Sequence, residues 1–297
     1  MKKSNLKRIL YFFLVVGFFS LFLSFVSAQY NYEFRNITTQ VNVTNSFPEI
    51  LNVSIDQDIT LNAGGFKTIF CNASIRDWNG WEDVSLVNAT FYHSSTSSHE
   101  AIDNGNSHYT NSSCENVNNV GDYIAVYECS FRVIHYANNG SWSCNVTAQD
   151  TFGFSNNLSN TTSINELYAI NVTSILDYGN LTVTETSDEV IANITNLGNM
   201  PIGVDVLGYG EFEGDGFGLI CALGGNIDVE HQRFSSASNL WIDKTPLNST
   251  NQDMGITIPQ PTDLTAPTFW ETFWQLYVPP NPQGLCTGTL RFTAKAS

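Results

Sequence analysis

Hydrophobic and polar residues alternate with a period of two along most of the chain. Between residues 68 and 75, Ile69, Cys71 and Ala73 fall on one face of an extended backbone, whereas Asn72 falls on the other. The same alternation recurs in five further segments, at residues 84–91, 127–133, 142–148, 190–194 and 286–294. A period of two predicts β-strands with one buried face.

Turn signals separate these segments. The run Asn138-Asn139-Gly140 favours a hairpin turn, and the proline-rich run at 279–284 cannot stay in a central strand. No segment after residue 28 has a sustained helical period with capping residues. Short strands, frequent turns and no helices predict an all-β chain with two tandem Ig-like β-sandwich domains.

Residues 1–28 are predicted to be a secretory signal peptide. Four basic residues precede an apolar run from Ile9 to Phe25, and Val26-Ser27-Ala28 supplies small residues before a cleavage point. The alternative is an uncleaved anchor helix, because about 17 apolar residues are just long enough to span a bilayer. After cleavage we expect no membrane span, and the protein is predicted to be secreted or located at the cell surface.

Three segments are expected behind the signal peptide. Residues 29–46 form an extended β arm, residues 47–165 an Ig-like β-sandwich with four cysteines, and residues 166–297 a second β-sandwich with two. The boundary between the sandwiches is placed in the polar run at 156–165. A length of 297 residues suits this division, since a domain has roughly 150 residues.

The arm has the composition of one or two strands, because Phe34, Ile37, Val41 and Val43 are apolar. An open strand edge and an exposed apolar face are costly, so the arm must pair somewhere. One outcome is pairing along an edge of its own first domain. The other is β-augmentation of a neighbouring subunit, which in a head-to-tail arrangement builds filaments.

The chain has six cysteines, an even number that favours disulfides in an oxidising compartment. They include no CxxC pair of the kind that zinc sites use. The four cysteines of the first domain allow three pairings. We favour Cys71 with Cys144, because inward cysteines on an early and a late strand of facing sheets are the immunoglobulin arrangement. The predicted disulfides are then Cys71–Cys144, Cys114–Cys129 and Cys221–Cys286.

Asn-x-Ser/Thr occurs 14 times, about twice as often as the composition alone would give. In the expected strands, Asn72, Asn88, Asn145 and Asn193 fall opposite the cysteines and most aliphatic residues, where a glycan needs them. The alternative is that an Asn/Ser/Thr-rich composition produces the motif freely. The predicted glycosylation sites are Asn36, Asn42, Asn52, Asn72, Asn88, Asn111, Asn139, Asn145, Asn157, Asn160, Asn171, Asn180, Asn193 and Asn248.

Charge excludes several classes of partner. The chain has 28 acidic and 12 basic residues, a net charge of −16. Without the four basic residues of the signal peptide, 8 basic residues remain and the net charge becomes −20. A nucleic-acid partner would need a basic surface, and so would electrostatic attachment to anionic lipid. We expect neither.

Two parts of the chain resemble a known group of proteins. The run FCNASIRDWNGWEDVSLVNATFY, followed by YECSFRVIHYANNGSWSCNVTAQDTFG, is similar to the Ig-like modules of uncharacterised secreted cell-surface proteins from small-genome archaea. The runs DYGNLTVTETSDEVIANITNLGNMPIGVDVLGYG and WQLYVPPNPQGLCTGTLRFTAKAS are similar to the C-terminal domain that follows such modules. The resemblance covers most of residues 47–297 and implies an extracellular or cell-surface protein with no established activity. Trp78 lies in an expected turn rather than on the strand after the first cysteine, so antibody-type ligand binding does not carry over.

The sequence contains none of the catalytic motifs that we sought. There is no G-x-S-x-G, H-E-x-x-H, P-loop or G-x-G-x-x-G after a strand. His93, His99 and His108 match no known metal-site spacing. The acidic pair Asp56 and Asp58 and the turn DWNGWED offer calcium-type oxygen ligands, but turns whose side chains bond their own backbone are the preferred interpretation. We expect no cofactor, no metal and no enzymatic activity.

Trp78 and Trp81 flank Asn79-Gly80 in this turn and are the candidate ligand-binding residues. An exposed aromatic ring at a loop tip can stack on a sugar or on a partner surface. The competing interpretation is that both rings pack into the core, since most tryptophans do.

These features predict a non-catalytic, N-glycosylated structural or adhesive protein outside the cell. Its expected partners are further copies of itself or other cell-surface proteins. The alternative is a β-sandwich module that binds carbohydrate or a host surface, with a glycan as its ligand.

Overall fold

The structure is a computed structural model that describes residues 11–14 and 33–297. Residues 11–14 are helical, and the rest of the signal peptide predicted at 1–28 lies outside the described residues. Within the described ranges, no helix is long and apolar enough to cross a membrane. Contacts group the chain into two units, Met1–Thr44 and Asn45–Ser297.

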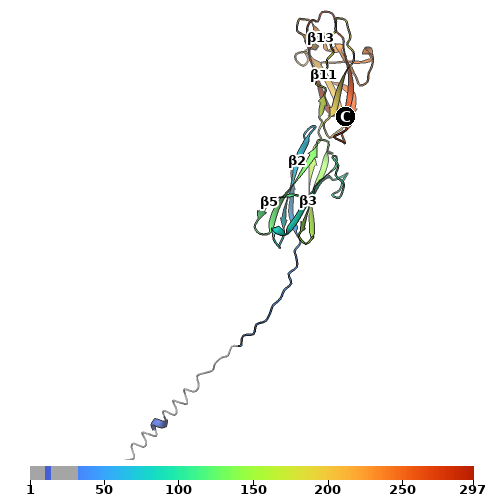
Figure 1. Cartoon of the computed structure of the whole chain (residues 1–297). Helices are drawn as coiled ribbons and strands as arrows, with labels where there is room; N and C mark the ends of the chain where they lie inside the picture. Colours follow the sequence, from blue (N-terminus) through green and yellow to red (C-terminus); the bar gives the residue numbers. More distant parts are fainter. Residues whose placement is uncertain (1–10, 15–32) are drawn as a thin grey trace, which may run out of the picture. The chain divides into compact units, whose positions relative to one another are not determined.

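The first β-sandwich consists of two four-stranded antiparallel sheets, with strand orders β1-β2-β6-β5 and β4-β3-β7-β8 (Figure 1). These orders are those of the ABED and C′CFG sheets of an immunoglobulin domain. The antiparallel sheets, here and in the second sandwich, confirm the all-β prediction. The strands are β1 (Glu49–Ile55), β2 (Phe66–Arg76), β3 (Val84–His93), β4 (His108–Asn111), β5 (Glu115–Val120), β6 (Ile124–Ile134), β7 (Gly140–Asp150) and β8 (Ser155–Ile164).

A disulfide between Cys71 and Cys144 joins the two sheets through the core. Cys71 lies on β2 and Cys144 on β7, and neither is exposed. Phe91 of β3 lies opposite Cys144 in the sheet, and its ring centroid is 4.7 Å from that of Trp142. The Trp142 indole N–H donates to the Asn138 carbonyl oxygen at 2.8 Å. The core aromatic of this domain is therefore Phe91 on β3, with Trp142 stacked beside it, and Trp78 takes no part.

A second disulfide, Cys114–Cys129, secures the start of β5. Cys129 lies directly opposite Cys71 in the β2–β6 pair, so two disulfides begin at neighbouring positions on the same face of one sheet. Cys114 also donates its backbone N–H to the Val87 carbonyl oxygen at 2.8 Å. These pairings are the ones that the sequence favours.

The second β-sandwich encloses a separate apolar core between a five-stranded sheet, β15-β14-β17-β10-β9, and a three-stranded sheet, β16-β11-β19. A third small sheet, β13-β12-β18, carries the Cys221–Cys286 disulfide between two adjacent strands. The strands are β9 (Ile170–Val172), β10 (Val190–Asn196), β11 (Ile202–Tyr209), β12 (Phe217–Cys221), β13 (Asn226–Asp228), β14 (Gln232–Ser235), β15 (Thr245–Pro246), β16 (Gln252–Ile258), β17 (Phe269–Leu276), β18 (Cys286–Thr287) and β19 (Thr289–Ala296).

A buried asparagine bonds to segments of both sandwiches. Asn199 is not exposed at all, and its Oδ1 accepts a hydrogen bond from the Leu167 N–H at 2.7 Å. Its Nδ2 donates to the carbonyl oxygens of Ala137, at 3.1 Å, and Asn165, at 3.0 Å. A buried amide with all of these bonds made is stabilising, whereas each unpaired backbone group would cost about 1–3 kcal/mol. The connection near residue 165 is therefore held by specific polar contacts.

The described part of the arm, residues 33–46, contains no strand. Residues 33–48 have no regular secondary structure, although one or two strands are expected from their sequence. Ile37, Val41 and Val43 are 87%, 81% and 78% exposed. Exposure of this kind leaves an apolar face without the burial that normally stabilises a strand.

Removal of a disulfide is expected to destabilise the protein more when the bond closes a longer loop, with a logarithmic dependence on loop length. Replacing Cys71 and Cys144 by alanine should lower the free energy of unfolding by about 4 kcal/mol, and replacing Cys114 and Cys129 by about 3 kcal/mol. The reason is that the first bond closes a separation of 73 residues and the second one of 15. Urea unfolding of the two variants measures both values, and a larger loss for the shorter loop would contradict this account.

Candidate functional site

The turn between β2 and β3 places one tryptophan at the surface and the other against the core. The Asp77 carboxylate accepts a hydrogen bond from the Asn79 N–H at 2.8 Å, and the Asp77 carbonyl oxygen accepts one from the Gly80 N–H at 3.2 Å. Gly80 has φ 120°, a value that side chains rarely allow. These constraints direct Trp78 outward, at 59% exposure, while Trp81 packs against the first core.

Trp78 is the centre of a small exposed platform. Its ring centroid is 5.5 Å from that of Tyr123, and the Arg76 guanidinium carbon lies 4.7 Å from the centroid of the indole ring. Arg76 also forms an ion pair with Glu49, at 2.5 Å. An aromatic face with polar neighbours is suited to stacking on a sugar ring or on a partner surface. Neither Tyr123 nor Arg76 is among the residues that the sequence singles out. For Tyr123 the reason is that only strand pairing brings it beside this turn.

Three carboxylates meet behind the same turn. Ligand oxygens of Asp77, Asp83 and Asp150 all lie within 4.8 Å of one another. Burial raises the pKa of the Asp77 carboxyl above its ordinary value of 3.8, a hydrogen bond from Asn79 partly offsets this, and the charges of Asp83 and Asp150 raise it further. In the described part of the chain this is the one group of His, Cys, Asp and Glu close enough to hold a metal ion.

Other acids considered from the sequence do not join this group. Asp56, Asp58 and Glu82 lie outside it, although Glu82 belongs to the same turn. Asp150 is the member that sequence reasoning misses, because it follows Asp83 by 67 positions. The structural link is the antiparallel pairing of β3 with β7, in which Val84 lies opposite Asp150.

The three histidines of the Ser-rich segment are not brought together as metal ligands. His93 is hydrogen-bonded to Thr96 Oγ1 at 2.8 Å and to the Asn139 carbonyl oxygen at 3.1 Å. His108 is bonded to Asp103 at 2.8 Å. His99 lies on the surface beside a glutamate. His93 and His108 are buried and have structural partners of their own.

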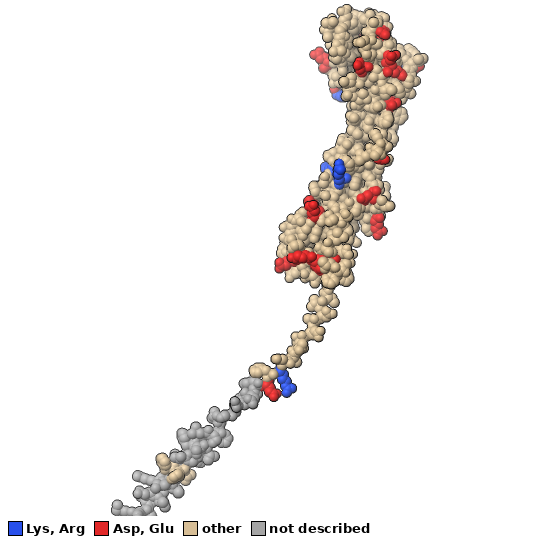
Figure 2. All heavy atoms as spheres, viewed as in Figure 1, with Lys and Arg blue, Asp and Glu red and all other residues tan. Residues whose placement is uncertain are grey.

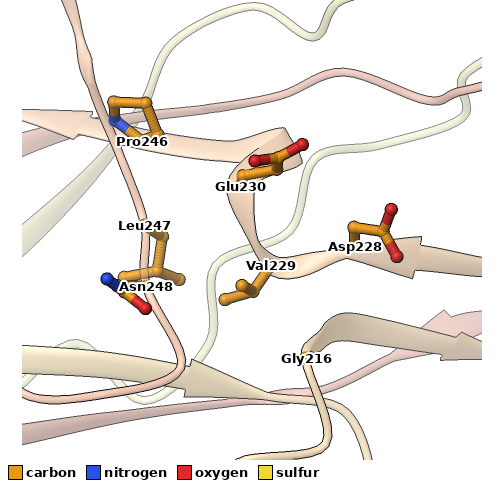
Figure 3. A pocket seen from close by; sticks show the side chains of 7 residues that line it. All are labelled: Gly216, Asp228, Val229, Glu230, Pro246, Leu247 and Asn248. Atoms are coloured by element: carbon orange, nitrogen blue, oxygen red, sulfur yellow. The ribbon is translucent and has the colours of Figure 1, made fainter.

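Two of the hollows in the second sandwich bear on function. The first, about 440 Å³, has two carboxylates, Asp228 and Glu230, and the sequon residue Asn248 on its wall (Figure 3). A glycan on Asn248 would cover this hollow. The second, about 820 Å³, is a groove lined by Ile170 and Val172 of β9 and by residues of β18 and β19.

Comparison with known proteins gives no family. No family model matches the chain, and no curated protein matches it significantly. Among solved structures, the chain is similar to the CsuC–CsuE chaperone–tip adhesion subunit pre-assembly complex from archaic chaperone-usher Csu pili of Acinetobacter baumannii, with 12% identity, a TM-score of 0.40, and coverage of 82% of this chain and 100% of that chain.

Two further solved structures are similar at lower scores. The first is the CupB6 tip adhesin from Pseudomonas aeruginosa, with 9% identity, a TM-score of 0.28, and coverage of 82% of this chain and 94% of that chain. The second is the C-terminal domain of the Streptococcus pyogenes antigen I/II-family protein AspA, with 9% identity, a TM-score of 0.26, and coverage of 84% of this chain and 99% of that chain. All three TM-scores are below 0.5. Neither the architecture described above nor the proposed function rests on these similarities.

The two tryptophans of the turn should respond differently to substitution. Trp78→Ala is expected to change the free energy of unfolding by less than about 0.5 kcal/mol, because the ring is exposed. Trp81→Ala should cost about 2 kcal/mol or more, because it removes a ring that packs against the core. Chemical denaturation of both variants measures the difference. Equal losses would show that the turn does not separate the two rings.

Proposed function

We propose that the protein is a non-catalytic structural or adhesive component of a cell surface. The sequence resemblance implies that this is the surface of an archaeal cell. Three disulfides support an oxidising compartment. The observation that carries the proposal is the arm, whose exposed apolar positions have the period of a strand but no sheet to join. In this proposal the arm links copies of the protein.

Residues 36–43 of the arm have one polar and one apolar face. In an extended chain Ile37, Val41 and Val43 share one face, and the sequon residues Asn36 and Asn42 share the other. Glycans on the second face would keep that side in solvent. The arm therefore has the pattern of an edge strand that buries one face against a partner.

The groove between β9 and β19 provides the matching surface. β9 is an edge of the five-stranded sheet, and β19 is an edge of the three-stranded sheet, so both have backbone groups without a strand partner on one side. Leu290 and Phe292 of β19 are only partly buried and line the groove. We assign this groove to the arm of a second copy, added as a strand beside β19.

An arm-to-groove contact uses different surfaces on the two copies. Such a heterologous contact does not close on itself unless the rotation between copies permits a ring, and it otherwise builds a filament. A filament of disulfide-stapled sandwiches is suited to a cell-surface coat or thread. This assembly requires no catalytic group.

Assembly through the arm is tested with three forms of the secreted protein. A version beginning at Asn45 and the variant Val41→Lys should remain monomeric, because each removes the apolar strand face. Gln40→Lys is the matched control, since it adds the same charge on the opposite, polar face. Light scattering and electron microscopy should show filaments for the parent protein and for Gln40→Lys only. A parent protein that is monomeric at high concentration contradicts the proposal.

We also propose that the surface is N-glycosylated. None of the 14 sequon asparagines is buried, whereas Asn196 and Asn199, which are not in sequons, are 1% and 0% exposed. Glycopeptide mass spectrometry of native material should find sugar on most of Asn72, Asn88, Asn145 and Asn193. Unmodified peptides at all four positions would leave the composition alone as the reason for the motifs.

Carbohydrate binding through Trp78 is the second candidate function, favoured by the exposed ring beside Tyr123 and Arg76. A glycan array probed with the protein and with Trp78→Ala distinguishes the two functions. Signals that the substitution abolishes, without loss of assembly, would establish a binding module on the same scaffold.

A further inference from the structure

We propose that Asp77, Asp83 and Asp150 bind a calcium ion at the end of the first sandwich that carries the β2–β3 turn. Asp77 directly follows β2, Asp83 ends the short 3-10 helix Trp81–Asp83 just before β3, and Asp150 is the last residue of β7. Their ligand oxygens lie within 4.8 Å of one another, a spacing that suits one shared cation. The site is independent of the proposed assembly through the arm.

Unpaired buried oxygens point to a missing ligand. Asp77 Oδ2 and Asp83 Oδ2 are buried and have no hydrogen-bond partner, and the Asp77 residue is 0% exposed. Asn45 Oδ1 is a third such atom, and the Asn45 amide lies at the group because its Nδ2 donates to Asp150 Oδ2 at 2.7 Å. Buried carboxylate oxygens without a partner are costly, and a bound cation removes that cost.

The other oxygens of Asp77 and Asp83 are already used by the fold. Asp77 Oδ1 accepts from the Asn79 N–H at 2.8 Å, and Asp83 Oδ1 accepts from the Thr151 hydroxyl. Each carboxylate is thus oriented by one oxygen and keeps the other for a ligand. This division of roles is what a preformed cation site requires.

Both oxygens of Asp150 accept hydrogen bonds, and its Oδ2 accepts the one from Asn45 Nδ2 at 2.7 Å. Its Oδ1 accepts hydrogen bonds from the Phe152 and Phe154 N–H groups, both at 2.9 Å. The Thr151 N–H donates to the Asp83 carbonyl oxygen at 2.9 Å, which ties the two acidic positions together. The backbone therefore determines the separation of the carboxylates before any ion arrives.

The donor set selects the ion. All the candidate ligands are carboxylate or amide oxygens, with no nitrogen or sulfur, which favours a hard cation. No ion pair of the described residues involves these carboxylates, so no basic side chain neutralises them there. Calcium accepts irregular oxygen geometry and completes its shell with water, whereas magnesium demands a near-ideal octahedron.

The ion would also connect the turn to the start of the sandwich. Trp78 follows Asp77 directly, and the Ser46 N–H donates to Asn79 Oδ1 at 2.7 Å. Calcium at this point cross-links β2, β3 and β7 beneath the aromatic platform. The platform would therefore be more rigid with the ion than without it.

Calcium and magnesium chloride are titrated into the chelator-treated secreted protein by calorimetry, and melting is followed with and without calcium. We expect heat of binding with calcium, much weaker heat with magnesium, and a rise in Tm of about 5–10 °C at a hundredfold excess over Kd. Asp77→Asn, which leaves the sequence Asn-Trp-Asn and so creates no glycosylation motif, should weaken calcium binding at least tenfold. Asp122→Asn, which removes an exposed charge outside the group, is the control and should bind as the parent does.

The melting temperatures of the variants separate a cation site from a purely structural role. Without calcium, Asp77→Asn should melt above the parent, because it removes one of three neighbouring negative charges at a buried position. With calcium, it should melt below the parent. A variant that melts lower in both conditions, or a parent that binds no calcium at millimolar concentration, would overturn the proposal.

Discussion

The Cys71–Cys144 bond is the constraint on which the first sandwich depends. It holds β2 of one sheet against β7 of the other at a point where neither sulfur is exposed. Once these strands are in place, β3 pairs with β7 so that Phe91 lies opposite Cys144. The same register, followed to its end, puts Val84 opposite Asp150 and hence Asp83 beside it. The acidic group and the aromatic platform are therefore consequences of how the core is closed.

The strands and the disulfides of this chain can be predicted from its sequence, because both depend on the local alternation of apolar and polar residues. Inward positions such as Cys71 and Cys144 share a face with aliphatic residues, and burial follows that alternation in β2 and β7. The candidate site is harder to predict from the sequence. Asp150 and Tyr123 lie beside the turn only because strands pair. For Asp150 the pair is β3 with β7, which includes a register shift between Val84 and Leu86 that the sequence spacing does not predict. The choice between Trp78 and Trp81 depends on the backbone at Gly80, which composition does not reveal.

The arm shows the opposite case, in which the sequence pattern is clear and the single chain leaves it unused. An alternating apolar face is expected to form a strand, yet a strand requires a partner for its backbone as well as for its side chains. Residues 33–44 have no regular secondary structure, and the side chains of Ile37, Val41 and Val43 are exposed. In the proposed assembly, the groove of a second copy supplies both kinds of partner.

Charge determines which forces could hold copies together. Acidic side chains outnumber basic ones on the visible face of the described chain (Figure 2), and the 28 acidic residues face only 12 basic ones in the whole sequence. Copies with the same negative charge repel at low ionic strength, so attraction between them must come from apolar burial and backbone hydrogen bonds. Salt at 0.1 M screens the repulsion beyond about 10 Å, and it leaves apolar burial and backbone hydrogen bonds intact. Assembly through an apolar strand face is thus the mode that this surface permits best in a saline medium, and a divalent cation bound among carboxylates would reduce the same repulsion at its source.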